Sequence, residues 1–188
     1  EEHQLRCLGR SILPEIVSAR GPGDKVRIWS QPCSTGEEAY SIALWLLENW
    51  PMVDAYNIEI VGSDIDSEAL EAACAGRYGQ RSLSRLPASV AASYFEPATG
   101  GLRQLIPDLR ESVAFTHANL IDRASMGAQG LFDVIFCRNV LIYFDQPTKS
   151  QILERVHHVL APDGALFMGG AESVLGVTNL FKSIEEQR

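Results

Sequence analysis

The sequence predicts an α/β fold in which a Rossmann-like parallel sheet carries helices on both faces and a small β subdomain is inserted. Apolar runs of strand length alternate with helical runs from about residue 26 onward, which is typical of βαβ units with right-handed crossovers. This alternation stops at about residue 77 and resumes at about residue 112. We therefore expect residues 77–111 to form the inserted subdomain.

Each element is expected from its hydrophobic spacing and from the residues that end it. Near the N-terminus, Leu5, Leu8 and Ile12 recur at helical spacing, so residues 3–19 should form one or two helices before the break "RGPGD". The elements expected after it are a strand "VRIWS" (26–30), a helix 36–48, a strand "NIEIVGSD" (57–64), a helix ending at Gly76, strands "SVAFTHAN" (112–119) and "FDVIFCRN" (132–139), a helix 147–160 and, after a turn "PDG", a strand "ALFMGG" (165–170).

The inserted segment has a weaker pattern. A short helical piece "LPASVAASYF", a turn "PATGG" and a strand "LRQLIP" are expected within it. The domain prediction is accordingly an N-terminal helical segment over residues 1–25 and a main domain over 26–188 that carries the insertion at 77–111.

Composition excludes several classes of function. The net charge of −8 argues against nucleic acid or an anionic membrane as the main partner. The apolar runs are too short to span a bilayer, and the first ten residues lack the apolar core of a signal peptide. The cysteines lie far apart without a CxxC pair, and the histidines show no metal-ligand spacing. We expect no metal and buried thiols in a reducing cytoplasm.

The stretch "SQPCSTGEEAYSIALWL" (30–46) predicts the end of a strand, a tight loop and a helix. Ser34 or Thr35 could cap that helix, with Glu37 or Glu38 at the third helical position of a capping box. Two adjacent glutamates cannot both serve one cap, so one of them should face the sheet edge; we expect this to be Glu38. A phosphate would be repelled there, and the GxGxxG fingerprint is missing. A cationic cofactor without phosphate fits better, and S-adenosylmethionine is the obvious candidate.

Two further strand ends carry polar residues. Asp64 ends the second strand, where βαβ nucleoside sites place an acid against the ribose hydroxyls. Asp66 or Ser67 could cap the next helix, which leaves Asp64 available for a ligand. Asn119-Leu120 follows the next strand of the sheet and could frame an adenine ring, although the same residues also suit a plain turn.

The stretch "CRNVLIYF" places Arg138 and Asn139 at the end of an apolar strand. A charged residue is costly there without a partner. Arg138 could pair with an acid such as Glu172, or it could orient a carboxylate of cofactor or substrate. Tyr143 could pack, or its hydroxyl could lie on the cofactor edge. Arg20, just before the first strand, is a second candidate for a carboxylate-orienting cation.

Five segments together resemble the CheR-type methyltransferases of bacterial chemotaxis. They are "WSQPCSTGEEAYSIA", "GSDIDSEALEAA", "HANLID", "FDVIFCRNVLIYF" and "LAPDGALFMGGAES", and the similarity runs in order from about Arg27 to Ser173. The resemblance implies a class I methyltransferase fold that uses S-adenosylmethionine, releases S-adenosylhomocysteine and methylates glutamate side chains in the cytoplasmic part of chemoreceptors. It also implies that the insertion matches a small β subdomain, which in some members docks a receptor tail peptide.

The resemblance extends to site residues. It implies cofactor contacts from Glu37 or Glu38, Asp64, Asn119-Leu120 and Arg138-Asn139, and it implies that Tyr143 lies beside the transferred methyl group. An ionised substrate glutamate needs no general base, because its pKa lies far below neutral pH. The enzyme would then act by alignment.

The sequence also departs from the family pattern "AACSTGEEPYS", at Gln31-Pro32 and Ala39. The family's N-terminal helical domain and its "TxFFR" segment are not found, so residues 1–25 would be a remnant of that domain, and one more strand would be expected after "FKSIEEQR". Two alternatives stay open: a methyltransferase with another substrate, and a non-catalytic module that binds S-adenosylmethionine or S-adenosylhomocysteine and signals through a partner.

Overall fold

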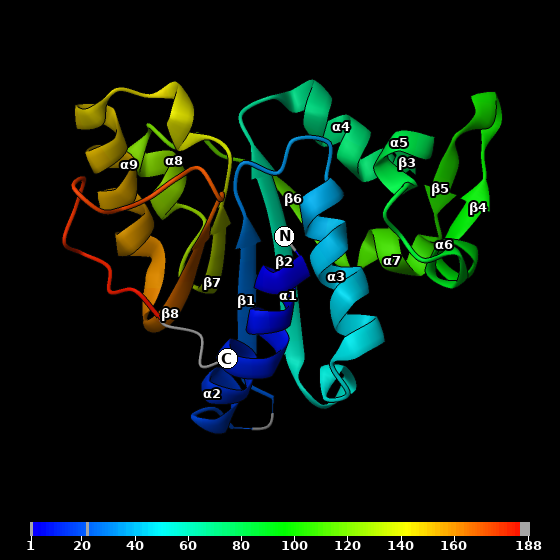
Figure 1. Ribbon diagram of the computed structural model, residues 1–188, viewed down its shortest axis with the longest axis horizontal. Helices are drawn as coiled ribbons and strands as arrows, with labels where there is room; N and C mark the ends of the chain where they lie inside the picture. The colour runs from blue at the N-terminus through cyan, green and yellow to red at the C-terminus, as the bar shows by residue number, and fades with distance from the viewer. Residues whose placement is uncertain (1, 22, 185–188) are drawn as a thin grey trace.

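The computed structural model describes residues 2–21 and 23–184. Within them the main sheet has the strand order β6-β2-β1-β7-β8, and all neighbouring strands run parallel (Figure 1). The strands are β1 (Lys25–Ser30), β2 (Asn57–Asp64), β6 (Val113–His117), β7 (Phe132–Cys137) and β8 (Leu160–Met168). The predicted α/β fold is confirmed. The chain moves outward from β1 to β2 and β6, then crosses to β7 and β8, so the strand order reverses beside β1.

The carboxyl ends of the strands meet at one edge, which is the upper edge in Figure 1. Asp64, the last residue of β2, pairs with His117, the last residue of β6. Cys137 pairs with Met168 where β7 and β8 end, and Ser30 ends β1 between them. Ligands of open α/β sheets bind beyond this edge, next to the switch point.

Helices cover both faces of the sheet, as expected. One face carries α1 (Glu2–Cys7), the π-helical turn η1 (Leu8–Ile12), α2 (Leu13–Ser18) and α3 (Glu37–Asn49). The other carries α8 (Arg123–Gly127) and α9 (Gln146–Val159). The sequence prediction missed α8, whose five residues are too few to show a period.

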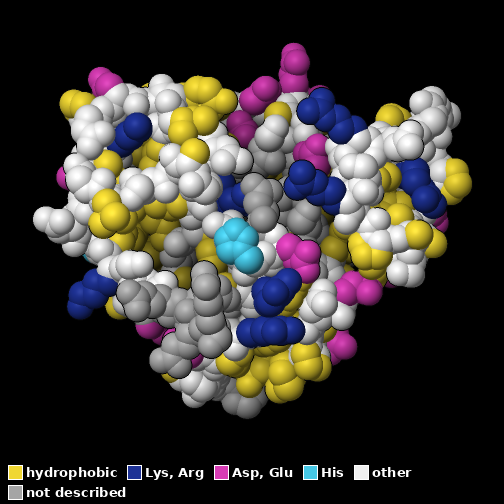
Figure 2. Space-filling model, viewed as in Figure 1, with side chains coloured by type: hydrophobic (Ala, Val, Ile, Leu, Met, Phe, Trp, Pro, Cys, Tyr) yellow, Lys and Arg dark blue, Asp and Glu magenta, His cyan; other side chains and the backbone are white. Residues whose placement is uncertain are grey.

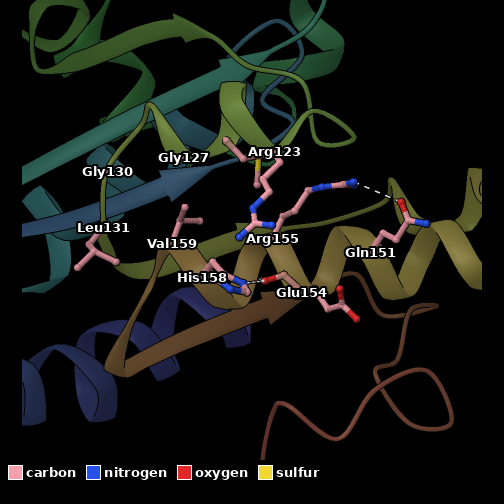
Figure 3. Close-up of a pocket in the computed structure, with 10 residues that line it drawn as sticks. Arg123, Gly127, Gly130, Leu131, Gln151, Glu154, Arg155, His158 and Val159 are labelled. Atoms are coloured by element: carbon pink, nitrogen blue, oxygen red, sulfur yellow. Dashed lines mark hydrogen bonds between the residues drawn. The ribbon is translucent and has the colours of Figure 1, made fainter.

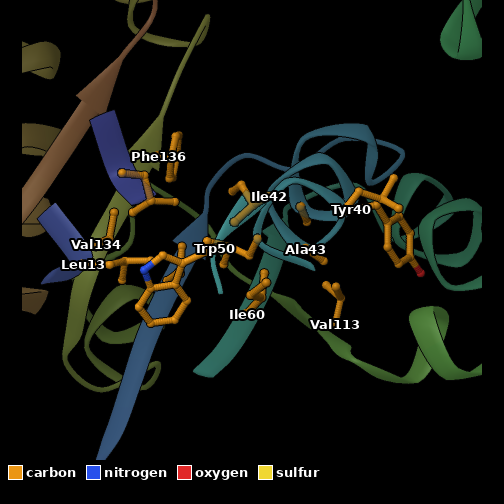
Figure 4. Close-up of a cluster of buried hydrophobic side chains, with 14 of the residues drawn as sticks. Leu13, Tyr40, Ile42, Ala43, Trp50, Ile60, Val113, Val134 and Phe136 are labelled. Carbon is orange, nitrogen blue, oxygen red and sulfur yellow. The ribbon is translucent and has the colours of Figure 1, made fainter. Parts of the chain in front are cut away.

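The core on the first face joins the N-terminal helices to α3 and the sheet. Leu13 and Ile42 are fully buried there beside Val134 and Phe136, as Figure 4 shows. Burying one such side chain contributes roughly 1.5–3 kcal/mol. The helices at 2–18 therefore share the core of the sheet that follows them.

The helix after β2 is α4 (Ser67–Ala75). Asp66 caps it by accepting hydrogen bonds from the backbone N–H groups of Glu68 and Ala69, and Gly76 ends it with a left-handed φ of 58°. The expected start and end of this helix are confirmed. Short 3₁₀ turns complete the main domain: η2 (Val53–Ala55) and η4 (Leu141–Tyr143).

The segment 77–111 forms a small antiparallel sheet with strand order β3-β5-β4, seen on the right in Figure 1. Its elements are β3 (Arg77–Tyr78), α5 (Gln80–Leu83), α6 (Ala88–Tyr94), β4 (Phe95–Pro97), η3 (Thr99–Gly101), β5 (Arg103–Leu105) and α7 (Pro107–Glu111). The inserted helix, turn and strand were expected; β3, β4, α5 and α7 were not, because two to five residues carry no readable period.

The expected turn "PDG" lies inside β8. Phe132 pairs with Leu160, but Val134 pairs with Ala165, so Pro162–Gly164 bulges out of the ladder. Proline cannot donate to a ladder, and a bulge accommodates it. Among the described residues, no helix is long and apolar enough to cross a membrane.

Candidate functional site

The loops beyond the carboxyl ends of the strands form a polar edge. Figure 2 shows acidic side chains gathered at the top of the view, above the ends of β1 and β2. The structure brings Glu38, Asp64, Asn119 and the loop 138–143 to this edge from four different strands. Arg20, by contrast, lies at the opposite edge of the sheet, beside Asp133.

The loop between β1 and α3 turns through two left-handed residues, Ser34 with φ of 48° and Gly36 with φ of 90°. Gly36 is the N-cap of α3, and among the described residues no side chain caps that helix. The expected capping by Ser34 or Thr35 is therefore wrong. Because the left-handed Gly36 delays the helix, Glu37 becomes its first residue, and neither glutamate reaches the third position that a capping box requires.

Glu38 forms an ion pair with Arg138 across the ends of β1 and β7. The distance from Arg138 Nη1 to Glu38 Oε2 is 2.7 Å, and the two side chains are 9% and 21% exposed. The hydroxyl of Ser30 donates to the other carboxylate oxygen at 2.8 Å. Among the described residues, Arg138 thus forms its ion pair with Glu38, where the sequence suggested an acid such as Glu172.

Glu37 points toward the inserted subdomain. Its carboxylate accepts hydrogen bonds from the hydroxyl of Thr35 at 2.5 Å and from that of Ser82, in α5, at 3.2 Å. Tyr78 adds a second link, because its hydroxyl donates to the carbonyl oxygen of Thr35 at 2.8 Å. Burial raises the pKa of the Tyr78 phenol above its usual value, which keeps that proton in place. The β1–α3 loop is therefore tied to the subdomain.

Asp64 is 7% exposed and holds two loops together. Its Oδ2 accepts a hydrogen bond from the backbone N–H of Ser34 at 2.8 Å, and its Oδ1 accepts one from that of Asp66 at 3.0 Å. An ionised carboxylate can accept about four hydrogen bonds, so two remain available for ligand hydroxyls.

Asn119 and Leu120 follow β6. The side-chain oxygen of Asn119 accepts a hydrogen bond from the N–H of Ile121 at 3.0 Å, which closes a turn. Leu120 is 6% exposed and packs in the core of the α8–α9 face. Because that side chain is buried, only the backbone of this pair and the half-buried Asn119 can face a ligand.

The loop after β7 carries Arg138, Asn139 and Tyr143. Asn139 is left-handed, with φ of 57°, and Tyr143 is 78% exposed at the edge. The carboxylate of Glu172 fixes this loop by accepting hydrogen bonds from the backbone N–H groups of Asn139, Val140, Leu141 and Gly169, at 2.7, 2.8, 2.7 and 2.9 Å. Sequence reasoning missed this role, since Glu172 lies more than 30 residues beyond the loop in the sequence.

Arg20 does not belong to this edge. Its guanidinium pairs with Asp133, near the start of β7, and lies 3.8 Å from Asp163. Asp133 is buried and also accepts a hydrogen bond from the backbone N–H of Arg27 at 2.8 Å. Arg20 neutralises a buried acid at the amino ends of the strands, so the interpretation of Arg20 as a carboxylate-orienting cation at the site is wrong.

Exposed aliphatic side chains flank the acids. Ile65, directly after Asp64, is 56% exposed, and Ile121, after the strand next to it, is 49% exposed. His117 contacts the carbonyl oxygen of Ile65 at 3.1 Å, which places the two loops side by side. Sequence reasoning overlooked both residues; the signal was an apolar residue placed among polar ones at a strand end.

A cavity of about 440 Å³ lies apart from this edge, between α8 and α9 (Figure 3). Arg123 and Met126 of α8 line it together with Gln151, Arg155 and His158 of α9. The residues predicted for the site are not among its lining.

Comparison with known proteins shows which family the sequence matches. The family model described as "CheR methyltransferase, SAM binding domain" matches residues 1–188. "Chemotaxis protein methyltransferase 2" of Vibrio cholerae is 46% identical over 181 residues, which cover 96% of this chain and 62% of that protein. "Probable biofilm formation methyltransferase WspC" of Pseudomonas aeruginosa is 38% identical and covers 86% of this chain and 37% of its own length. The chain thus spans less than two thirds of these relatives.

A solved structure supports the fold alone. The crystal structure of a possible exported protein from Bordetella parapertussis aligns with a TM-score of 0.51 at 20% identity. The alignment covers 89% of this chain and 40% of that one.

Proposed function

Because the chain belongs to the CheR methyltransferase family, we propose that it transfers methyl groups from S-adenosylmethionine to glutamate side chains of chemoreceptors in the cytoplasm. The observation that carries the proposal is the family match over residues 1–188, which includes every loop of the polar edge. The matched family model describes a domain that binds S-adenosylmethionine, and the charged groups at the polar edge suit that cofactor.

The residues at the edge fit this cofactor. S-adenosylmethionine carries a sulfonium, an ammonium and a carboxylate but no phosphate, and the edge offers acids, one arginine and exposed aliphatic groups. Asp64 would accept hydrogen bonds from the ribose hydroxyls, and Arg138 would hold the cofactor carboxylate with Asn139 beside it. The adenine would lie against Ile65 and the backbone of Asn119-Leu120.

The two glutamates, Glu37 and Glu38, would have different roles. Glu38 is bound to Arg138 and Ser30 in the middle of the edge, so it would keep the guanidinium in place for the cofactor. Glu37 faces Thr35 and Ser82 and would connect the loop to the subdomain.

The chain's own residues would act by alignment. When bound, S-adenosylmethionine supplies an electrophilic methyl group on its sulfonium. The acceptor glutamate is ionised near neutral pH, so no side chain has to remove a proton. Tyr143 would lie beside the acceptor, because its exposed ring sits at the end of the loop that starts with Arg138. Holding acceptor and donor in line can supply much of the rate enhancement.

The inserted subdomain offers a place for a receptor peptide. A groove of about 420 Å³ lies there, lined by Leu83 and Ser84 near the end of α5, by Ala88 and Ala91 of α6, and by Arg103 of β5. An extended peptide could add to an edge of the three-stranded sheet, and Arg103 could pair with a peptide carboxylate. A receptor tail is the partner we propose for it.

A second substrate assignment is favoured by one relative. The protein of Pseudomonas aeruginosa that is named for biofilm formation shares 38% identity with this chain. An acceptor that serves biofilm formation is therefore the alternative that we propose.

A transfer assay tests the proposal. The protein would be incubated with methyl-labelled S-adenosylmethionine and the cytoplasmic fragment of a chemoreceptor, with and without alanine at its glutamate acceptors. Label that appears on the fragment and disappears with the glutamates supports the proposal. Bound cofactor without transfer to any fragment would instead indicate a non-catalytic binding module.

A further inference from the structure

We propose that Glu172 is a positioning residue for methyl transfer, which holds the loop 138–143 in the geometry that the reaction needs. This inference rests on the proposed function and adds to it a residue that touches neither cofactor nor acceptor. Glu172 lies after β8, whereas the loop that it fixes follows β7, so the link joins two neighbouring strand ends.

The hydrogen bonds to Glu172 fill its carboxylate. Within the described chain, Oε1 accepts the N–H groups of Val140 and Leu141, and Oε2 accepts those of Asn139 and Gly169. Each distance is 2.9 Å or less, which is typical of charge-assisted bonds. A carboxylate offers about four acceptor sites and all four are used here, so an amide side chain, whose NH₂ group only donates, cannot replace it without loss.

The donors are successive backbone groups of the loop. Three consecutive N–H groups point at one anion because Asn139 adopts a left-handed conformation, with φ of 57°. A non-glycine residue adopts this conformation at a cost, so the surrounding structure must hold it. Glu172 provides that hold from one side, and the 3% exposed Leu141 anchors the loop in the core from the other.

The turn that carries Glu172 is equally constrained. Its own N–H donates to the carbonyl oxygen of Gly169 at 2.9 Å, while the N–H of Gly169 donates to its carboxylate. A Cβ at Gly169 would lie 2.4 Å from Asn139 Oδ1 and 2.6 Å from Glu172 Oε2. An alanine at this position would therefore displace the side-chain end of Asn139, the carboxylate of Glu172, or both.

Loss of the hydrogen bonds to Glu172 should disturb only one part of the site. Arg138 begins the fixed loop and Tyr143 ends it, so a change at Glu172 moves the side chain beside the acceptor. Asp64 and Ile65 belong to other loops and would keep the nucleoside. We therefore expect Glu172 to affect the rate of transfer far more than the affinity for the nucleoside.

The test compares Glu172→Gln with the unmodified protein. A glutamine would present an NH₂ group to two N–H donors, so the loop should shift. Misplacement by about 1 Å can cost roughly a hundredfold in rate. We expect kcat to fall at least about tenfold, with the Kd for 5′-methylthioadenosine, a nucleoside that lacks the carboxylate which Arg138 would hold, within about threefold. Hydrogen exchange of the amides of residues 139–141 should become faster.

Gly169→Ala perturbs the same contact from the other partner and serves as the second variant if Glu172→Gln does not fold. It should lower kcat with the same selectivity, and the double variant should be less than additive because both changes disrupt one unit. Asp145→Asn is the matched control. Asp145 accepts the N–H of Thr148 at the start of α9, just beyond the loop, and asparagine caps a helix about as well. Its kcat should stay within about twofold.

The outcomes separate the two proposals. Unchanged kcat in Glu172→Gln, or a Kd that weakens in proportion to kcat, would overturn the positioning role while leaving methyl transfer intact. Absence of transfer by the unmodified protein would overturn the proposed function, and the positioning role with it.

Discussion

Arg138 and Glu38 face each other across the ends of β7 and β1, with Nη1 and Oε2 2.7 Å apart and little of either side chain exposed. A hundred residues separate them in the sequence, yet β1 and β7 are hydrogen-bonded neighbours in the sheet. The pair therefore places a cation, already oriented by an acid, at the switch point where α/β folds bind their ligands.

Glu38→Gln should weaken the binding of S-adenosylhomocysteine about tenfold or more. A hydrogen bond to a charged group contributes about 1.5–3 kcal/mol, and about 1.4 kcal/mol corresponds to tenfold in affinity. Without the charge of this carboxylate, the ion pair that orients Arg138 is lost. Isothermal titration calorimetry measures the effect.

Glu37→Gln is the matched control for that change. Glu37 accepts hydrogen bonds from two hydroxyl groups at the subdomain side, and an amide oxygen can still accept them. The affinity should change less than about threefold. A larger loss for Glu37→Gln than for Glu38→Gln would reverse the roles that we assign to the two glutamates.

Asp64→Asn should lower the affinity for S-adenosylhomocysteine by at least about tenfold, since it removes a charged acceptor from a nearly buried position. The amide would also set an NH₂ group against the N–H of Ser34 or Asp66. Equilibrium dialysis checks the result. Asp66→Asn is the control, because asparagine caps α4 as well as aspartate does; equal losses in both variants would contradict a ligand role for Asp64.

Tyr143→Phe should slow methyl transfer several-fold, about the effect of one lost hydrogen bond, while cofactor binding stays nearly unchanged. The 78% exposed ring lies at the outer end of the loop, where an acceptor would approach. Single-turnover transfer and S-adenosylhomocysteine binding separate the two effects. The neighbouring Ile142→Val, also at an exposed position, is the control, and an unchanged transfer rate in Tyr143→Phe would refute the role.

Gly36→Ala should destabilise the fold more than Gly23→Ala does. Both glycines have a left-handed φ, of 90° and 98°, which costs an alanine about 1–2 kcal/mol. A Cβ at Gly36 would also lie 2.9 Å from Ala73 Cβ, whereas nothing lies within 4 Å of one at Gly23. Overpacking adds about 1–3 kcal/mol. Urea unfolding measures the difference, and equal losses would mean that the α3–α4 contact relaxes freely.

The thiols should differ in their reactivity at pH 8. Burial, with the charge of Asp64 next, raises the pKa of Cys33 to about 12, and burial raises the pKa of Cys137 to about 12. The thiolate is the reactive form, and at pH 8 only about one part in ten thousand of these thiols would be ionised. Cys74 is exposed. Mass spectrometry after iodoacetamide treatment should find Cys74 modified first; equal labelling of Cys33 in the folded protein would contradict its burial.

Long elements could be predicted from the sequence and short ones could not. The strand Asn57–Asp64 was predicted at its observed bounds, because an apolar run that ends in a charged residue fixes both its type and its end. The strand Arg77–Tyr78 has only two residues, and α8 has five, so neither shows a period. Their positions depend on contacts with distant parts of the chain.

The candidate site, too, could be predicted only in part. Strand ends could be located from the sequence, so Asp64 and Arg138 were placed at one edge correctly. Side-chain partners could not be inferred, because they depend on strand order and on backbone geometry. The left-handed Gly36 shifted the start of α3 and removed the expected cap. Arg20 was misplaced because its partner, the buried Asp133, lies more than a hundred residues away and at the opposite edge.

The chemical identity of the modified residue tests the central claim most directly. After incubation with S-adenosylmethionine and a receptor cytoplasmic fragment, peptide mass spectrometry would locate the methyl group, before and after mild alkali. The proposed function predicts added methyl groups on glutamate side chains, lost on alkaline treatment because they are esters, and about tenfold fewer of them with Asp64→Asn at limiting cofactor. Methyl groups that resist alkali, or that lie on residues other than glutamate, would contradict it.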